Sequence, residues 1–224
     1  KTYQSHRWQE QIKIETIYFE EYAYYLVSET RQKRVNHIFK LGGNVYAFDS
    51  TTINLCLSVF WWAKFRKKKE GIKVHTLYDV ETQIPAFFHI TEASVHDSKT
   101  MIDNPYESGS YYIFDRGYNN FKMLCKIHQI EAYFVAKAKK NLNTNPSNGN
   151  VGYPRMCFQT QVYFWLDSIL NNIIQALRLI KYWDEKQKKE FVIITNATHI
   201  SALQVAELYK NRWQVELFFK WLKQ

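Results

Sequence analysis

The first part of the chain places apolar side chains at the spacing of one face of a helix, with charged residues between them. Between residues 8 and 39 this pattern predicts an amphipathic helical segment. Its apolar positions include Ile14, Ile17, Tyr18, Tyr22, Tyr25 and Leu26. Gly42 and Gly43 interrupt the pattern. Residues 1–43 are therefore expected to be a helical lead-in to a domain that occupies residues 44–224.

After the two glycines the hydrophobic pattern changes to short runs rich in β-branched and aromatic residues. The runs predicted to be strands are residues 45–48, 74–80, 84–90, 111–114, 132–136 and 191–195. Helical spacing returns at residues 98–102 and 119–128, and from Ser201 to the last residue. Strands that first follow one another and then alternate with helices indicate a mixed α/β sheet flanked by helices.

Residues 139–154 are polar and rich in Asn, Gly and Pro, which predicts a loop or the entry to an insertion. We expect this insertion to span about residues 139–195, before the last helix. The chain begins with Lys and ends at Gln224 inside a helical pattern, which predicts a fragment of a longer protein.

The composition indicates a folded, basic protein. Its 224 residues are 46% hydrophobic and 17% aromatic, enough for one sizeable core, and the net charge of +9 favours a polyanionic partner such as DNA. Three cysteines without a C-x-x-C pair indicate neither a disulfide framework nor a zinc site. The longest apolar run, residues 55–63, is too short to span a membrane, so we expect a cytoplasmic protein.

Two aspartates follow predicted strands directly. Asp49 ends VYAFD and Asp115 ends YYIFD. One such aspartate is usually a turn or capping residue. If the two strands lie side by side and parallel, however, both carboxylates emerge at one edge of the sheet, where a hard cation such as Mg²⁺ could bind.

The final helix offers a third acid. On a wheel of 100° per residue, Tyr209, Arg212, Glu216 and Lys223 lie within about 60° of one another. An adjoining apolar stripe is expected to face the core. It consists of Val215, Phe218, Phe219 and Leu222.

These residues together resemble the IS4 family of bacterial insertion-sequence transposases, whose Y-R-E-K signature matches Tyr209, Arg212, Glu216 and Lys223. Further matching motifs follow in the family's order. They are FDSTT at 48–52, GIKVHTLYD at 71–79, ASVHD at 93–97 and FDRGY at 114–118.

The resemblance implies an RNase H-like fold and cut-and-paste transposition by a DDE triad. Asp49, Asp115 and Glu216 would bind Mg²⁺, for which Mn²⁺ may substitute, and catalyse strand cleavage and strand transfer. Tyr209, Arg212 and Lys223 would hold DNA phosphates. The implied partners are double-stranded DNA, as transposon ends and target, and a second copy of the chain on that DNA, in the bacterial cytoplasm.

Other residues allow two interpretations. A basic run beside Trp61 and Trp62 suits contact with the DNA backbone, although a solvated charged loop has the same composition. It consists of Lys64, Arg66, Lys67, Lys68 and Lys69. His96 and Asp97 could position the active site or a phosphate, or Asp97 could cap the following helix.

Residues 145–176 do not match the β-rich insertion of the family, a pattern that two compensating changes of reading frame would produce. This departure keeps two alternatives open. One is a catalytically inactive DNA-binding remnant of a transposase. The other is a general nuclease of the same fold, which would not need Tyr209, Arg212 and Lys223 beside Glu216.

Overall fold

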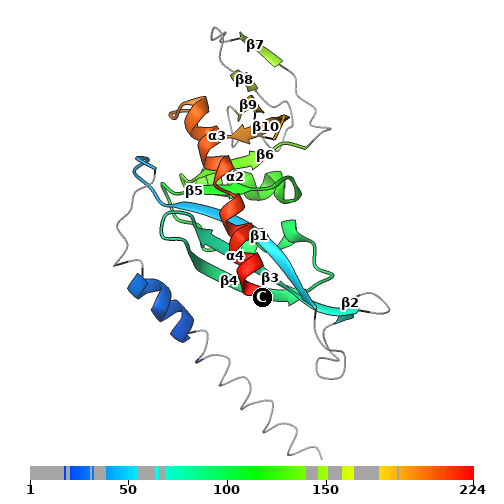
Figure 1. Ribbon diagram of the computed structural model, residues 1–224. Helices are drawn as coiled ribbons and strands as arrows, with labels where there is room; N and C mark the ends of the chain where they lie inside the picture. The colour runs from blue at the N-terminus through cyan, green and yellow to red at the C-terminus, as the bar shows by residue number, and fades with distance from the viewer. Residues whose placement is uncertain are drawn as a thin grey trace, which may run out of the picture.

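A mixed β-sheet runs through the middle of the protein (Figure 1). The computed structural model describes residues 18, 21–30, 32, 39–54, 64–65, 69–139, 146–150, 158–163, 177–185 and 187–224. Within them the sheet has ten strands in the order β2-β3-β1-β5-β6-β10-β9-β8-β7, with β4 paired to β3. The strands are β1 (Val45–Asn54), β2 (Lys64–Phe65), β3 (Lys69–Asp79), β4 (Ile84–Glu92), β5 (Tyr111–Phe114), β6 (Tyr133–Lys137), β7 (Pro146–Asn150), β8 (Phe158–Tyr163), β9 (Leu177–Asp184) and β10 (Lys189–Thr195).

The centre of the sheet combines antiparallel and parallel pairing. β3 pairs antiparallel with both β1 and β4, whereas β1, β5 and β6 run parallel to one another. The turn between β3 and β4 is closed by Asp79, whose carboxylate accepts the amides of Glu81 and Thr82. Three antiparallel strands followed by two parallel ones form the expected RNase H-like mixed sheet, and that prediction is confirmed.

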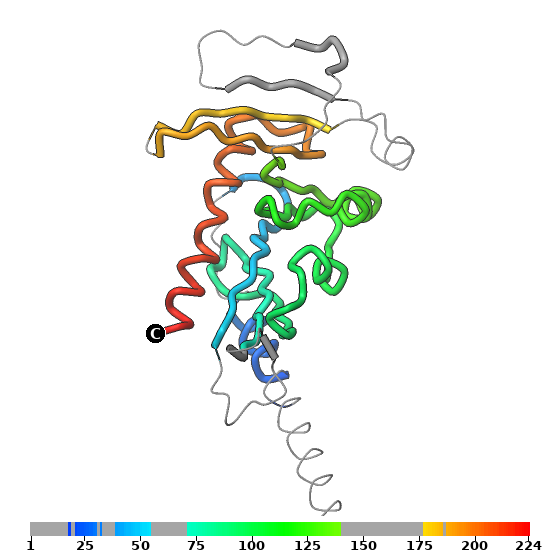
Figure 2. The backbone as a smooth tube through the Cα atoms, turned by 90° about the vertical axis from the view of Figure 1, so that its right-hand side faces the viewer, coloured from blue at the N-terminus to red at the C-terminus, as the bar shows by residue number. Residues whose placement is uncertain are grey.

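Helices cover both faces of the sheet (Figure 2). They include the α-helices α2 (Phe121–Gln129), α3 (Ala202–Lys210) and α4 (Trp213–Leu222) and the 3-10 helices η1 (Asp97–Asp103) and η2 (Arg116–Tyr118). Residues 21–30 are also helical. Alternate residues of a strand point to opposite faces. Accordingly, Phe48 and Phe114 join the core beneath α2, while Ala47 and Ile113 join the core beneath α3 and α4.

Several predicted limits of strands and helices are wrong, because pairing between strands distant in sequence lengthens some strands and creates others. β1 continues six residues past Phe48, since β3 supplies a partner as far as Asn54↔Gly71. β7 lies inside residues 139–154, which were predicted to be a loop or the entry to an insertion, so only the loop alternative is wrong. β9 was not predicted. The helix expected from Ser201 to the end is divided into α3 and α4.

Some predictions concern residues outside those that the structure describes. They include the lead-in before residue 18, the apolar run at 55–63 and most of the unmatched segment at 145–176, of which the structure describes residues 146–150 and 158–163. Among the described helices, none is both long and apolar enough to cross a membrane.

Candidate active site

The parallel pairing of β1 and β5 brings Asp49 next to Asp115. The register ends at Phe48↔Phe114, so each aspartate is the next residue on its own strand. Asp115 lies where β5 ends and η2 begins, as predicted. Asp49 lies in the middle of β1, so the prediction that it ends its strand is wrong. What ends at this level is the pairing with β5. The Asp49 side chain lies two residues after Ala47 and therefore on the face of the sheet that α4 covers.

Arg212 joins the sheet to the last helix. Its Nη1 donates to Asp49 Oδ2 at 2.8 Å, and its Nη2 donates to Glu216 Oε1. Arg212 is the N-cap of α4, just after the break between the two helices. At the break the amide of Arg212 donates to the carbonyl of Tyr209, three residues back. The chain therefore keeps a helical path, and Tyr209, Arg212 and Glu216 reach the same region although the helix is interrupted.

Asp115 has its own partners. The Tyr209 hydroxyl donates to Asp115 Oδ1 at 3.1 Å, and Lys137 Nζ at the end of β6 lies 3.9 Å from the same oxygen. Lys137 was not predicted as a site residue. The signal available was that β6 follows the Asp115 strand in the same parallel sheet, so that its last residue, Lys137, comes out at the same edge.

The two aspartates have opposite electrostatic environments. Burial raises the pKa of Asp49 to about 6 in spite of the Arg212 charge, and the carboxylates of Glu216 and Asp115 raise it further. Burial also acts to raise the pKa of Asp115, but the Arg116 amide and the charges of Arg212 and Lys137 outweigh it and hold that pKa below its usual value. Asp115 therefore ionises easily at neutral pH, whereas burial makes ionisation of Asp49 unfavourable.

The donor chemistry of this region fits a divalent cation. Three carboxylates are oxygen donors of the kind that Mg²⁺ takes together with water and substrate phosphates. Burial is the main cause of the raised pKa of Asp49, and the nearby carboxylates of Glu216 and Asp115 add to it. Within the described ranges, no three His, Cys, Asp or Glu side chains are grouped closely enough to hold a metal as they stand. Asp49, Asp115 and Glu216 would therefore exchange part of their contacts with Arg212, Tyr209 and Lys137 for metal contacts.

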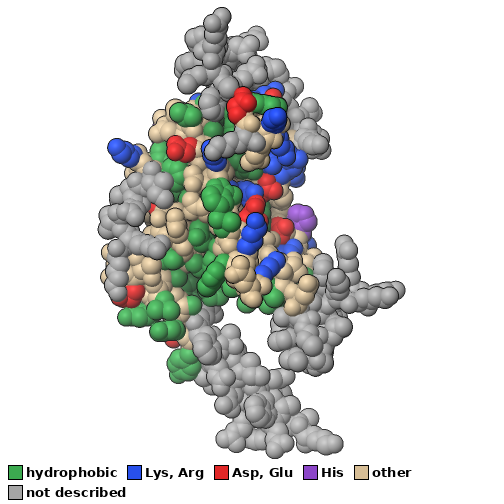
Figure 3. All heavy atoms as spheres, in the orientation of Figure 1, with side chains coloured by type: hydrophobic (Ala, Val, Ile, Leu, Met, Phe, Trp, Pro, Cys, Tyr) green, Lys and Arg blue, Asp and Glu red, His purple; other side chains and the backbone are tan. Residues whose placement is uncertain are grey.

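A basic cavity opens beside these residues. It has a volume of about 470 Å³, and its lining includes Lys137, Lys189, Lys210, Arg212 and Glu216. Figure 3 shows Lys and Arg side chains mixed with acidic ones in a band next to α4. The positive charge of the chain is thus partly gathered where the carboxylates lie.

The remaining predicted DNA-binding residues are Lys223 and the basic run at residues 64–69. Lys223 is the C-cap of α4 and is exposed, and its side chain makes no hydrogen bond or ion pair with the described residues. In the basic run, Lys64 and Lys69 lie in β2 and β3, but their side chains are outside the description. Arg66, Lys67 and Lys68 lie outside the described residues altogether. Leu222, predicted to face the core, is 41% exposed.

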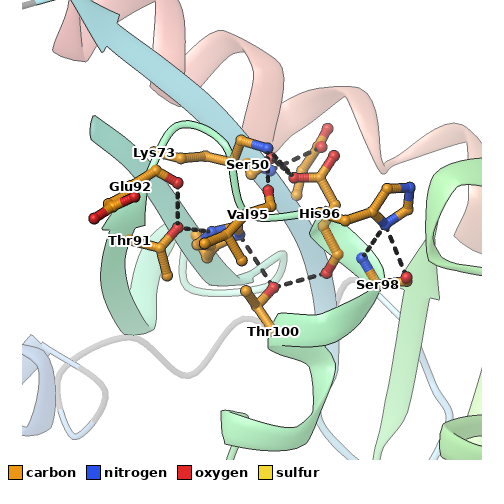
Figure 4. A network of polar contacts seen from close by, with 11 residues as sticks. Ser50, Lys73, Thr91, Glu92, Val95, His96, Ser98 and Thr100 are labelled. Atoms are coloured by element: carbon orange, nitrogen blue, oxygen red, sulfur yellow. Dashed lines mark hydrogen bonds and ion pairs between the residues drawn. The ribbon is translucent and has the colours of Figure 1, made fainter. Parts of the chain in front are cut away.

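The ASVHD motif forms a polar network on the other side of β1 (Figure 4). His96, not Asp97, is the N-cap of η1, since its Nδ1 accepts the Ser98 amide at 3.2 Å. The Asp97 carboxylate instead accepts the Ser50 hydroxyl at 2.8 Å and pairs with Lys73 Nζ at 3.0 Å. The capping interpretation of Asp97 is therefore wrong, and the motif contacts the residue that follows Asp49.

Comparisons with known proteins show what this chain is similar to. Residues 40–224 match the family described as Transposase DDE domain. A putative transposase, y4zB, from Sinorhizobium fredii (strain NBRC 101917 / NGR234) is 30% identical over 190 residues, which cover 79% of this chain and 50% of that protein. The probable transposase for insertion sequence element IS5377 from Geobacillus stearothermophilus is 26% identical over 178 residues, covering 79% and 47%.

The chain spans about half the length of these curated relatives. A third, the putative transposase for insertion sequence element IS4SA from Synechocystis sp. (strain ATCC 27184 / PCC 6803 / Kazusa), is 25% identical over 192 residues, covering 80% and 50%. A solved synaptic complex of piggyBac transposase with hairpin DNA aligns with 78% of this chain and 39% of that chain. Its identity is 12% and its TM-score 0.48.

Proposed function

This chain belongs to the family of transposase DDE domains, and we propose that it catalyses metal-dependent cleavage and transfer of DNA strands at the ends of an insertion sequence. The proposal extends the predicted resemblance to insertion-sequence transposases, which is confirmed. The observation that carries it is the convergence of Asp49, Asp115 and Glu216 around Arg212 and Tyr209. These residues come from a sheet and a helix far apart in sequence.

Asp49, Asp115 and Glu216 would hold Mg²⁺ or Mn²⁺. When bound, the metal would lower the pKa of an attacking water or 3′-hydroxyl and balance charge on the leaving oxygen. The reaction is an in-line displacement, in which the oxygen–phosphorus bond to the nucleophile forms as the bond to the leaving oxygen breaks. The low pKa of Asp115 keeps that carboxylate ready to accept a cation at neutral pH.

Arg212 and Tyr209 would position the scissile phosphate. A guanidinium presents several N–H donors in one plane and can hold a carboxylate and a phosphate at once. The hydroxyl of Tyr209 can donate to a phosphate oxygen once Asp115 turns to the metal. Lys137, Lys189 and Lys210 line the adjoining cavity and would neutralise flanking phosphates.

The remaining parts of the proposal concern the domain and its partners. We place the catalytic domain at residues 44–224, with an insertion at about 139–195, and the family match over residues 40–224 supports that placement. The proposed substrate is double-stranded DNA, as transposon ends and target. A homodimer on that DNA and a location in the bacterial cytoplasm belong to the same proposal, as does a contribution of Lys223 and of the basic run at residues 64–69 to DNA binding.

The test is cleavage of a DNA duplex by the purified chain with Mg²⁺ or Mn²⁺. Asp49→Ala, Asp115→Ala and Glu216→Ala should each abolish it, while Glu207→Ala, which removes an exposed acid of α3, should not. DNA binding measured in a chelator should be unchanged in all four variants. Cleavage that survives in the three triad variants would reject the site. If wild type binds DNA but cuts with neither metal, the chain is a DNA-binding protein without catalysis.

A further inference from the structure

The strand that carries Asp49 loses one neighbour at the position of the catalytic carboxylate. β1 pairs with β5 only as far as Phe48↔Phe114. From Asp49↔Thr76 to Asn54↔Gly71, β3 is the strand that pairs with β1 among the described residues. A strand edge without a partner is easily displaced. Something other than a β-ladder must hold Asp49 if a metal site is to keep its geometry.

Asp97, the first residue of η1, contacts β1 just beyond the point where the pairing with β5 ends. The Ser50 hydroxyl donates to Asp97 Oδ1 at 2.8 Å, and Lys73 Nζ lies 3.0 Å from the same oxygen. The Ser50 amide in turn donates to Asp49 Oδ1 at 2.8 Å. A continuous path of polar contacts therefore joins Lys73 and Asp97 to the Asp49 carboxylate through Ser50. Figure 4 labels Lys73 and Ser50 within this network.

This path is anchored firmly at its far end. Lys73 Nζ also donates to the Val95 carbonyl at 2.7 Å, and the Lys73 side chain is only 14% exposed. The Thr100 hydroxyl donates to the Asp97 carbonyl at 2.7 Å and contacts His75 Nδ1 at 3.2 Å. Backbone and carboxylate of Asp97 are thus both held, on a segment tied to β3.

The ion pair between Lys73 and Asp97 requires that Lys73 be largely removed from water, and a contribution to packing does not explain this free-energy cost. Lys73 and Asp97 are a charged pair in a place where Lys73 is largely removed from water, and such pairs contribute little to stability compared with apolar replacements. Hydrogen bonds from residues that do not touch the metal but orient a metal-binding carboxylate, by contrast, commonly change metal affinity by about 10–100-fold. The network fits that second role, because Asp97 contacts the Ser50 hydroxyl and the Ser50 amide donates to Asp49.

We propose that Lys73 and Asp97 are positioning residues for the metal site and act through Ser50 to hold Asp49 in place. This inference rests on the proposed function, because it presumes that Asp49 binds a divalent cation. It assigns a role to the ASVHD motif that does not involve contact with DNA or with the metal.

The experiment measures Mn²⁺ binding to the purified chain without DNA, from the loss of the electron paramagnetic resonance signal of free Mn²⁺. Asp97→Ala and Lys73→Met should each weaken binding about 10-fold or more. Lys99→Met, which removes an exposed lysine of η1, should bind like wild type. Ser50→Ala removes only one hydroxyl and should weaken binding to a similar extent, so the test stands even if Asp97→Ala fails to fold.

A double-mutant cycle separates positioning from general structural damage. If Asp97 acts through Ser50, the Ser50→Ala/Asp97→Ala protein should bind Mn²⁺ no more weakly than Asp97→Ala alone. Losses that multiply in the double variant, or wild-type affinity in the single variants, overturn the inference. Asp49→Asn tests the proposed metal site separately from the positioning role. If this variant binds Mn²⁺ as well as wild type does, the proposed metal site itself is wrong.

Discussion

The raised pKa of Asp49 makes a prediction about stability that needs neither DNA nor metal. A carboxyl group with a pKa of about 6 instead of 3.8 costs the folded chain about 3 kcal/mol when it is fully ionised. The folded chain binds this proton more tightly than the unfolded chain does. The penalty is therefore absent below the unfolded pKa, grows as the pH rises, and is complete above the folded pKa.

Asp49→Asn should remove this dependence on pH. Between about pH 4.5 and about pH 7.5 the penalty grows by about 2 kcal/mol. In a chelating buffer, the free energy of unfolding of Asp49→Asn minus that of wild type should increase by this amount over the same range. Urea denaturation followed by tryptophan fluorescence measures both, and Glu207→Gln, on the exposed side of α3, serves as the matched control.

Two results would refute this reasoning. One is a constant difference between Asp49→Asn and wild type across the pH range. The other is an equal change in Glu207→Gln, which would assign the effect to net charge instead of to burial. Addition of Mn²⁺ at about pH 7.5 should stabilise wild type and leave Asp49→Asn unchanged, because a bound cation relieves the same penalty.

Three further predictions concern the partners of the site and can be checked by the same denaturation measurement. Arg212→Ala leaves Asp49 buried without its ion pair and should destabilise the chain by about 3 kcal/mol or more near neutral pH. The loss should be smaller near pH 5, where Asp49 takes up a proton, and an equal loss at both pH values would contradict it. Tyr209→Phe removes the donor to Asp115 and should cost about 2 kcal/mol; no change would mean that water replaces the hydroxyl. Ser201→Ala breaks the capping box of α3 and should cost about 1 kcal/mol without altering Mn²⁺ affinity, whereas weakened Mn²⁺ binding would show that α3 positions the site.

The sequence alone determined the elements that depend on local pattern. The short apolar runs at residues 45–48 and 111–114 lie in the adjacent parallel strands β1 and β5, as expected. The spacing of Tyr209, Arg212 and Glu216 also placed three side chains in one region, as found. Alternation and helical spacing are set by backbone geometry, so they can be recognised without the rest of the fold.

The tertiary structure decided where those patterns end and which polar groups meet. β1 continues past Asp49 because β3 lies beside it. Residues 49–54 do not by themselves show which strand will pair with them. β9 was missed since its strand character depends on pairing with β10 and β8. The break before Arg212 was also not predicted from the continuous helical pattern.

The candidate site divides in the same way. Motif spacing pointed to Asp49, Asp115 and Glu216, but it did not reveal that Arg212 connects two of them or that Lys137 lies beside the third. Asp97 could equally have been a helix cap, because capping and ion pairing use the same side chain. Its contact with Ser50 and Lys73 joins residues distant in sequence, and only the assembled sheet brings them together.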